Sequence, residues 1–131
     1  MFDLIIALTV IHAMAKDLHY KVIGETFYGN HLLYDEIADG LEDYIDEIKE
    51  NYYMCRDYDV PLARDIFAAA VEKMKDSTAE NLRSEIKAAV YLIDQLATQK
   101  GEFSEGDITL LGDISKNLSK KLGFANNLLK Q

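Results

Sequence analysis

The residues best suited to chemistry form two pairs of metal-binding side chains on one segment of the chain. His31 and Asp35 are four residues apart, and so are Asp46 and Glu50. On a helix that turns about 100° per residue, all four positions fall within an arc of roughly 100° on one side. Imidazole and carboxylate together suit divalent iron, zinc or manganese, and oxygen ligands favour the harder ions and ferric iron. The pattern therefore indicates a metal site.

A single helix cannot bring the two pairs to one ion. Asp35 and Asp46 are eleven residues apart, which corresponds to about 16 Å along a continuous helix. Two copies packed antiparallel would solve this, because the first pair of one copy would face the second pair of the other at two identical sites. His19, late in the preceding helix, could add a nitrogen ligand. The paired Glu-x-x-His motif of intrachain di-iron sites is absent from the sequence, which also favours a site between subunits.

Four long helices and one short helix are predicted to position these residues. Apolar residues recur at spacings of three and four in each of them. The chain holds one proline and 7 glycines, which argues against a turn-rich β fold. We expect a single all-α domain over residues 1–131, a four-helix bundle with a short extra helix in the crossover between the second and third helices. The expected helices cover about residues 2–23, 29–56, 61–74, 78–99 and 104–129.

Two serine residues are predicted to begin the last two long helices. Ser77, with Glu80 three residues later, fits a capping box at the start of the third long helix. Ser104 can cap the fourth long helix in the same way. The crossover before Ser77 is about 20 residues long, which is enough to carry the chain from one end of the bundle to the other.

The composition constrains the partners and the compartment. The 131 residues are 49% hydrophobic and 28% charged, which is ordinary for a soluble globular domain. The 23 acidic residues exceed the 14 basic ones, which gives a net charge of −9. Such a surface repels nucleic acid and anionic lipid and attracts cations. Cys55 is the only cysteine, so no intrachain disulfide can form, which suits a reducing cytosol.

The apolar N-terminal stretch is interpreted as a buried helix rather than an export signal. It ends in Ala13-Met14-Ala15, which resembles a cleavage site, but Asp3 stands where a signal peptide carries basic residues. The run is also too short to span a bilayer. We therefore expect a cytoplasmic protein without a membrane anchor.

The ligand spacing resembles that of the Dps mini-ferritins, which belong to the ferritin-like proteins. Members typically show His-Trp-x-x-Lys-Gly or a close variant, then a Phe, then His-x-x-(Tyr/Phe)-Asp-Glu, and later Asp-x-x-x-Glu. The separations of twelve residues from His19 to His31 and eleven from Asp35 to Asp46 match the ferroxidase ligands of that family. The region 110–114 is similar to the start of its last helix. The matching positions are 19–24, Phe27, 31–36, Asp46 and Glu50.

The resemblance implies a ferritin-like fold and an iron-oxidising, iron-storing function. Dps-like subunits assemble from twofold dimers into a hollow dodecamer. Iron(II) binds between twofold-related subunits and is oxidised, usually by hydrogen peroxide and otherwise by oxygen, and the ferric product mineralises in the cavity. Carried over by position, His19, His31 and Asp35 would come from one subunit, and Asp46 and Glu50 from the other. Zinc could substitute for iron at such a site.

The chain departs from the family at two points. Tyr20 stands where the family usually has Trp near the iron site; because tyrosine can pack, donate a hydrogen bond and be oxidised, we expect altered kinetics rather than loss of activity. Many members bind DNA through a basic N-terminal tail, which we do not expect here, because the first helix is predicted to begin at about residue 2. With a net charge of −9, we expect no DNA binding at physiological salt.

Alternative interpretations stay open for the acidic residues and for the function. Asp107 and Asp113, near the start of the last helix, either cap that helix and complement its dipole or, as the resemblance implies, line an acidic threefold pore for iron(II). The whole chain could also be a metal-free helical interaction or structural protein. A third class is a shell that keeps the fold but binds zinc or nothing.

Overall fold

The computed structural model describes residues 1–99 and 101–130, and every regular element in these ranges is helical. The expectation of an all-α fold is therefore confirmed. The elements are α1 (Phe2–Lys21), α2 (Phe27–Ala38), α3 (Leu41–Ile48), the π-helical η1 (Lys49–Tyr53), the 3₁₀-helical η2 (Met54–Arg56), α4 (Ala63–Lys73), α5 (Ala79–Ala97) and α6 (Glu105–Leu129).

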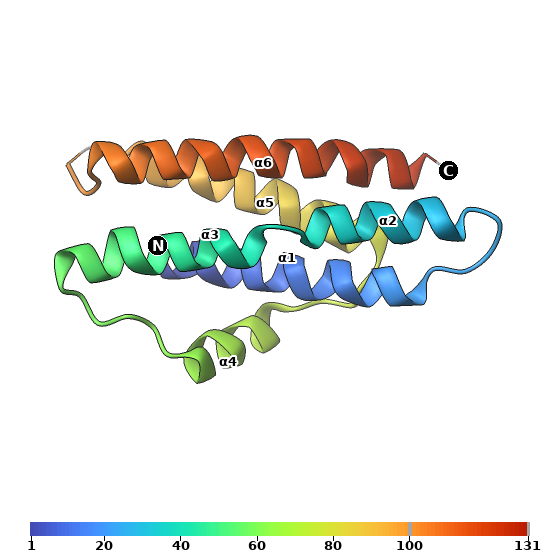
Figure 1. Cartoon of the computed structure of the whole chain (residues 1–131), viewed down its shortest axis with the longest axis horizontal. Helices are drawn as coiled ribbons and strands as arrows, with labels where there is room; N and C mark the ends of the chain where they lie inside the picture. The colour runs from blue at the N-terminus through green and yellow to red at the C-terminus, as the bar shows by residue number, and fades with distance from the viewer. Residues whose placement is uncertain (100, 131) are drawn as a thin grey trace.

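The long helices lie side by side as a bundle (Figure 1). Helix α1 packs against α2, α3 and α5, and α6 packs against α5 and α2, so that α1 and α6 occupy opposite corners. Helices α2, α3 and α5 run in one direction, and α1 and α6 run in the other (Figure 1). The crossover that contains α4 therefore carries the chain back along the whole bundle before α5 begins.

Helix α1 forms the centre of the core. The other helices of the first half, together with α5, pack around it, and α4 lies against it outside the bundle (Figure 1). Buried residues consequently occur on every side of α1 rather than on one stripe, which explains the continuous apolar run at the N-terminus. Among the described residues, no helix is long and apolar enough to cross a membrane.

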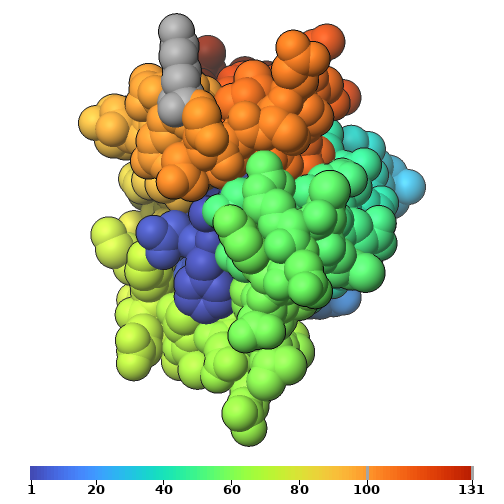
Figure 2. Space-filling view, turned by 90° about the vertical axis from the view of Figure 1, so that its left-hand side faces the viewer, coloured from blue at the N-terminus to red at the C-terminus, as the bar shows by residue number. Residues whose placement is uncertain are grey.

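The end of the bundle where α1 begins is built from three distant parts of the chain. Figure 2 looks onto this end and shows the first residues of α1, in blue, between the green segment around η1 and η2 and the yellow-green crossover. Met1 and Phe2 are half-buried there and pack on the core. The orange segment at the start of α6 lies above these residues in the same view (Figure 2).

The prediction of one continuous second helix is wrong, because the helix is broken at Asp39 and Gly40. Asp39 has extended backbone, and Gly40 has a φ of 79°, the left-handed region that glycine adopts at no steric cost. Lys121 of α6 donates from Nζ to the carbonyl oxygens of Glu36, Ile37 and Asp39 at 2.8, 2.9 and 2.6 Å. The two ligand pairs therefore sit on different helices, and the arc calculated for one helix does not apply across the break.

The predicted caps are confirmed for α6 and wrong for α5. Ser104 accepts a hydrogen bond from the backbone of Asp107, whose carboxylate accepts one from the backbone of Ser104, which completes a capping box. At α5 the cap is Thr78, whose hydroxyl accepts from the backbone three residues on. Ser77 instead donates its hydroxyl to Asp17 of α1 at 2.7 Å, so it ties the crossover to the core helix.

Candidate metal centre

Two histidines meet where the end of α1 lies against the start of α2. His19 Nδ1 donates to the backbone carbonyl of His31 at 2.7 Å, and His31 Nδ1 donates to the carbonyl of His19, also at 2.7 Å. A carbonyl oxygen can only accept, so each Nδ1 must carry a proton. The neutral form of each ring then has its lone pair on Nε2, which is the arrangement that metal-ligating histidines adopt when their other ring nitrogen donates to a backbone carbonyl.

Aromatic neighbours hold both rings in place. The His19 and His31 rings stack with centroids 3.5 Å apart and an angle of 22° between their planes. Phe27 stacks beside His31 at 5.2 Å, and Tyr20 meets His19 edge-on at 4.9 Å. His19 is buried, whereas 72% of Tyr20 is exposed. The rings are thus fixed before any ligand is present, and Tyr20 lies beside them with its phenol open to solvent.

Asp35, one turn after His31 on α2, is paired with a lysine of α1. Lys16 Nζ lies 3.0 Å from Asp35 Oδ1. The hydrogen bond from Lys16 is the main reason that the pKa of Asp35 is lower than usual. A cation that binds to this carboxylate must compete with the ammonium group or use Oδ2. The sequence contains a signal for this contact, because Lys16 lies three residues before His19 and therefore on a similar face of α1.

Asp46 and Glu50 form the other half of the predicted ligand set. Asp46 lies on α3 and Glu50 in η1, and both side chains are exposed. In the described part of the chain, neither carboxylate makes a hydrogen bond or an ion pair within the chain. Short π-helical stretches such as η1 are frequent at functional sites, because they shift the spacing of side chains along a helix. These carboxylates are therefore open to a group from outside the chain.

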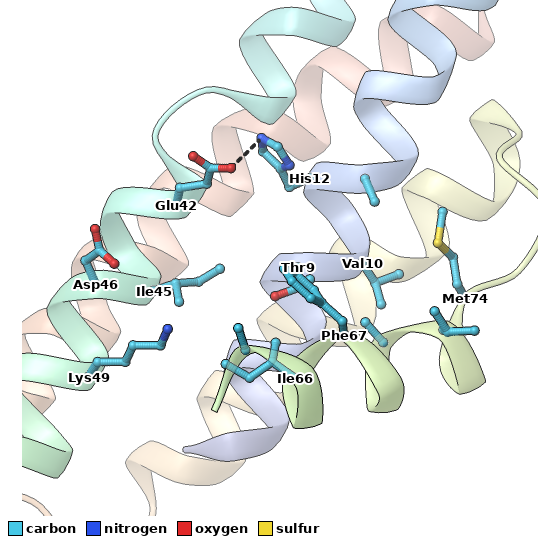
Figure 3. A pocket seen from close by; sticks show the side chains of 14 residues that line it. Thr9, Val10, His12, Glu42, Ile45, Asp46, Lys49, Ile66, Phe67 and Met74 are labelled. Atoms are coloured by element: carbon cyan, nitrogen blue, oxygen red, sulfur yellow. Dashed lines mark ion pairs between the residues drawn. The ribbon is translucent and has the colours of Figure 1, made fainter. Parts of the chain in front are cut away.

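Asp46 also borders an apolar groove between α1, α3 and α4 (Figure 3). The groove has a volume of about 530 Å³. On its α4 side, Phe67 and Val71 expose 61% and 73% of their surface. His12 and Glu42 form an ion pair of 3.6 Å across the α1–α3 rim (Figure 3). Any chain that covered this groove would reach the Asp46 carboxylate.

The five predicted ligands thus form two separate groups. His19, His31 and Asp35 lie around the crossing of α1 and α2, whereas Asp46 and Glu50 lie beyond the break on α3 and η1. Within the described residues of one chain, no three His, Cys, Asp or Glu side chains are placed to hold a metal ion. The twofold contact predicted from the sequence would have to bring the two groups together.

The two candidate pore residues differ from each other. Asp107 is 1% exposed, caps α6 and forms an ion pair with Arg56 of η2, so the capping interpretation holds for this residue. Its Oδ1 is buried without a hydrogen-bond partner. Asp113 is exposed on α6. Only Asp113 presents its carboxylate to ions in solution.

Comparison with known proteins does not identify a function for this chain. No protein-family model matches this sequence, and no curated protein is significantly similar to it. The geometry of the histidine pair and of the carboxylates is therefore the basis for a functional conclusion.

Proposed function

We propose that the chain is a ferritin-like subunit that oxidises and stores iron at a site shared between two copies, as in the Dps mini-ferritins. The observation that carries this proposal is the reciprocal pair of hydrogen bonds between His19 and His31. These bonds direct both Nδ1 atoms into the protein and leave both Nε2 atoms for a ligand. Metal-ligating histidines almost always donate their second ring N–H to a carbonyl or carboxylate in this way, which fixes the tautomer and ring orientation that the metal needs.

The arrangement of the helices supports the ferritin-like part of the proposal. Ferritin-like bundles have one long crossover connection between the second and third helices. In this chain the crossover containing α4 returns along the bundle, and α3 and α5 run in the same direction (Figure 1). A simple up-and-down bundle would join neighbouring antiparallel helices by short loops instead.

In the proposed dimer, the histidine group of one chain faces the carboxylates of the other. A twofold axis makes this contact twice, so each dimer has two identical sites. The apolar groove beside Asp46 gives the second copy a surface to cover, and Phe67 and Val71 would become buried in the contact. Two imidazole nitrogens with three carboxylates, from Asp35, Asp46 and Glu50, form a donor set that suits both iron(II) and iron(III).

Iron is the substrate of the proposed reaction. Two iron(II) ions each lose one electron, and one hydrogen peroxide takes up both electrons and two protons to give two water molecules. The carboxylates stabilise the extra positive charge on iron(III), and the product passes into a shell built from further dimers, with twelve chains expected. Asp113 is the residue that we propose for the entry path of iron(II), because its carboxylate is exposed.

Stopped-flow mixing tests this proposal directly. Protein free of metal is mixed anaerobically with iron(II) and then with peroxide, and the growth of ferric absorbance is followed. We expect rapid oxidation that is lost in His31→Ala and in Glu50→Ala. Glu47→Ala is the matched control, because Glu47 is an exposed carboxylate on the neighbouring helix α3. Equal rates in all four proteins would contradict the proposal.

A second candidate function is a helical interaction protein without ferroxidase activity. The exposed apolar side chains around the groove favour it, because contiguous exposed apolar surface marks contact sites. Light scattering with metal titration separates the candidates. A monomer would count against every shell, whereas a large assembly that binds zinc without oxidising iron would indicate a shell that has lost the activity.

A further inference from the structure

In the described part of the chain, Lys121 is the one buried basic residue of α6, and its ammonium group contacts the end of α2. It is 3% exposed and lies on the core face of α6, at helical spacing from Leu118 and Ala125. A charged group at such a position is costly unless its hydrogen bonds are satisfied. The three N–H groups of its ammonium meet three carbonyl oxygens, those of Glu36, Ile37 and Asp39.

These carbonyls are the ones that the helix break leaves unpaired. In a continuous helix, the carbonyls of Glu36 and Ile37 would accept from the backbone four residues later. Because α2 ends at Ala38 and the chain is extended at Asp39, those donors are withdrawn. A lysine ammonium at a helix C-terminus both replaces them and complements the negative end of the helix dipole.

The break separates the two ligand groups of the proposed site. His31 and Asp35 precede it on α2, and Asp46 and Glu50 follow it on α3 and η1. The angle between α2 and α3 therefore determines where the carboxylates of a chain lie relative to its histidines. In a twofold dimer, the same angle determines whether both groups can reach one ion.

We propose that Lys121 is a positioning residue for the metal site, whose ammonium group holds the break between α2 and α3 in one geometry and thereby sets the carboxylates against the histidines. This inference rests on the proposed function, because that function supplies the metal. The geometry of the break between α2 and α3 can be measured without metal. Met at this position would fill a similar volume with no donor and leave three carbonyls unpaired, whereas Gln would supply two donors without charge.

The first test measures the geometry of the break. Spin labels are placed at Tyr28→Cys on α2 and Glu47→Cys on α3, in a Cys55→Ser background, and labelled protein is diluted with unlabelled protein. We expect one narrow distance distribution with Lys121, a shifted or broadened one in Lys121→Met, and an intermediate one in Lys121→Gln. Lys120→Met is the matched control, because Lys120 is the exposed neighbour on the same helix. Identical distributions in all variants would overturn the inference.

The second test measures the site with cobalt(II), a probe that is not oxidised and whose visible spectrum reports its coordination geometry. Each variant is first checked for the same assembly size as the parent. We expect Lys121→Met to bind cobalt(II) about 10- to 100-fold more weakly and with an altered spectrum, an effect of the size seen for outer-shell partners of metal ligands. The cobalt(II) affinity of Lys121→Gln should lie between those of Lys121→Met and Lys120→Met. If Lys121→Met does not fold, Lys121→Gln takes its place in the comparison.

The outcomes separate the two proposals. If the parent protein and Lys121→Met bind cobalt(II) with the same affinity and spectrum, the positioning role is wrong and the proposed function stands. If the parent protein binds no cobalt(II), the proposed function is wrong and the positioning role at a metal site is wrong with it. The label distances would then still show whether Lys121 fixes the break.

Discussion

The histidine side and the carboxylate side of the candidate centre are organised to very different degrees. His19 and His31 bind each other's backbone, stack on each other and are packed by Phe27. Asp46 and Glu50 are exposed and have no hydrogen-bond partner in the chain among the described residues. The histidine half of the candidate centre is therefore organised by the fold of a single chain, whereas in the proposed site the carboxylate half would be placed by a contact between two copies.

This difference separates the energetics of folding from those of binding. Each neutral hydrogen bond contributes about 0.5–1.5 kcal/mol to stability, so the histidine pair supports the fold as well as the site. Exposed carboxylates without partners contribute little to the fold, because solvent screens them. Substitutions on the two sides should therefore have different signatures, and four predictions follow from this contrast, in order of decreasing effect.

The largest effect is expected for Glu50→Gln, which removes the charge of a proposed ligand while it keeps the shape. Metal affinity should fall by at least about 100-fold, beyond the range seen for outer-shell residues, while the melting temperature of the metal-free protein stays unchanged. Cobalt(II) titration and thermal unfolding measure the two quantities. Glu47→Gln should leave both unchanged, and an equal loss of affinity in that control would show that only net charge matters.

His31→Ala should weaken both metal binding and the fold. The substitution removes one of the reciprocal hydrogen bonds and the ring that stacks on His19, so the free energy of unfolding without metal should drop by about 2 kcal/mol. Urea denaturation of metal-free protein measures this. A stability equal to that of the parent would mean that the histidine pair is not preorganised by folding, and the contrast between the two sides would disappear.

Lys121 should give stability a specific dependence on pH. Burial lowers its pKa from 10.5 to about 8, opposed by Asp39 and Glu36 and assisted by Lys120. Between these values the unfolded chain holds a proton that the folded chain has released, so this group makes stability rise with pH. Relative to Lys121→Met, the parent should gain about 2 kcal/mol between pH 7.5 and 9.5. Urea denaturation at the two pH values tests this, and a falling difference would contradict it.

The smallest effect is expected for Lys16→Met, which frees the Asp35 carboxylate from its ion pair. Metal affinity should rise by up to about fivefold, because an exposed ion pair of this kind amounts to no more than about 1 kcal/mol. Cobalt(II) titration provides the measurement, and Lys21→Met, at an exposed position later in α1, is the control. Weaker binding in Lys16→Met would show that the lysine supports the site rather than competing for it.

Apolar periodicity was sufficient to predict most of the helices, because burying one face of a helix is what produces the pattern. The break at Gly40 was missed, since apolar residues continue at helical spacing across it and one glycine is tolerated inside a helix. Lys121 was missed for a related reason. A lysine at core spacing is normally exposed, and only the position of α6 beside the end of α2 shows what its ammonium group binds.

The candidate site could be predicted from the sequence only as a set of residue types and spacings. His31 and Asp35 lie one turn apart on the same helix, so their proximity follows from the local sequence pattern. The hydrogen bonds between His19 and His31 depend on how α1 crosses α2, and the Lys16–Asp35 ion pair depends on the same crossing. Such contacts join residues that are twelve and nineteen positions apart, and no local propensity encodes them.

The last helix also determines when the centre can mature during protein synthesis. All five proposed ligands lie within the first 50 residues, yet Lys121, which holds the break, and Asp107, which holds Arg56 at the end of η2, both come from α6. A nascent chain therefore displays all five proposed ligands before either tether has emerged from the ribosome. The order of translation itself would delay the correct spacing of the proposed ligands until α6 has been made.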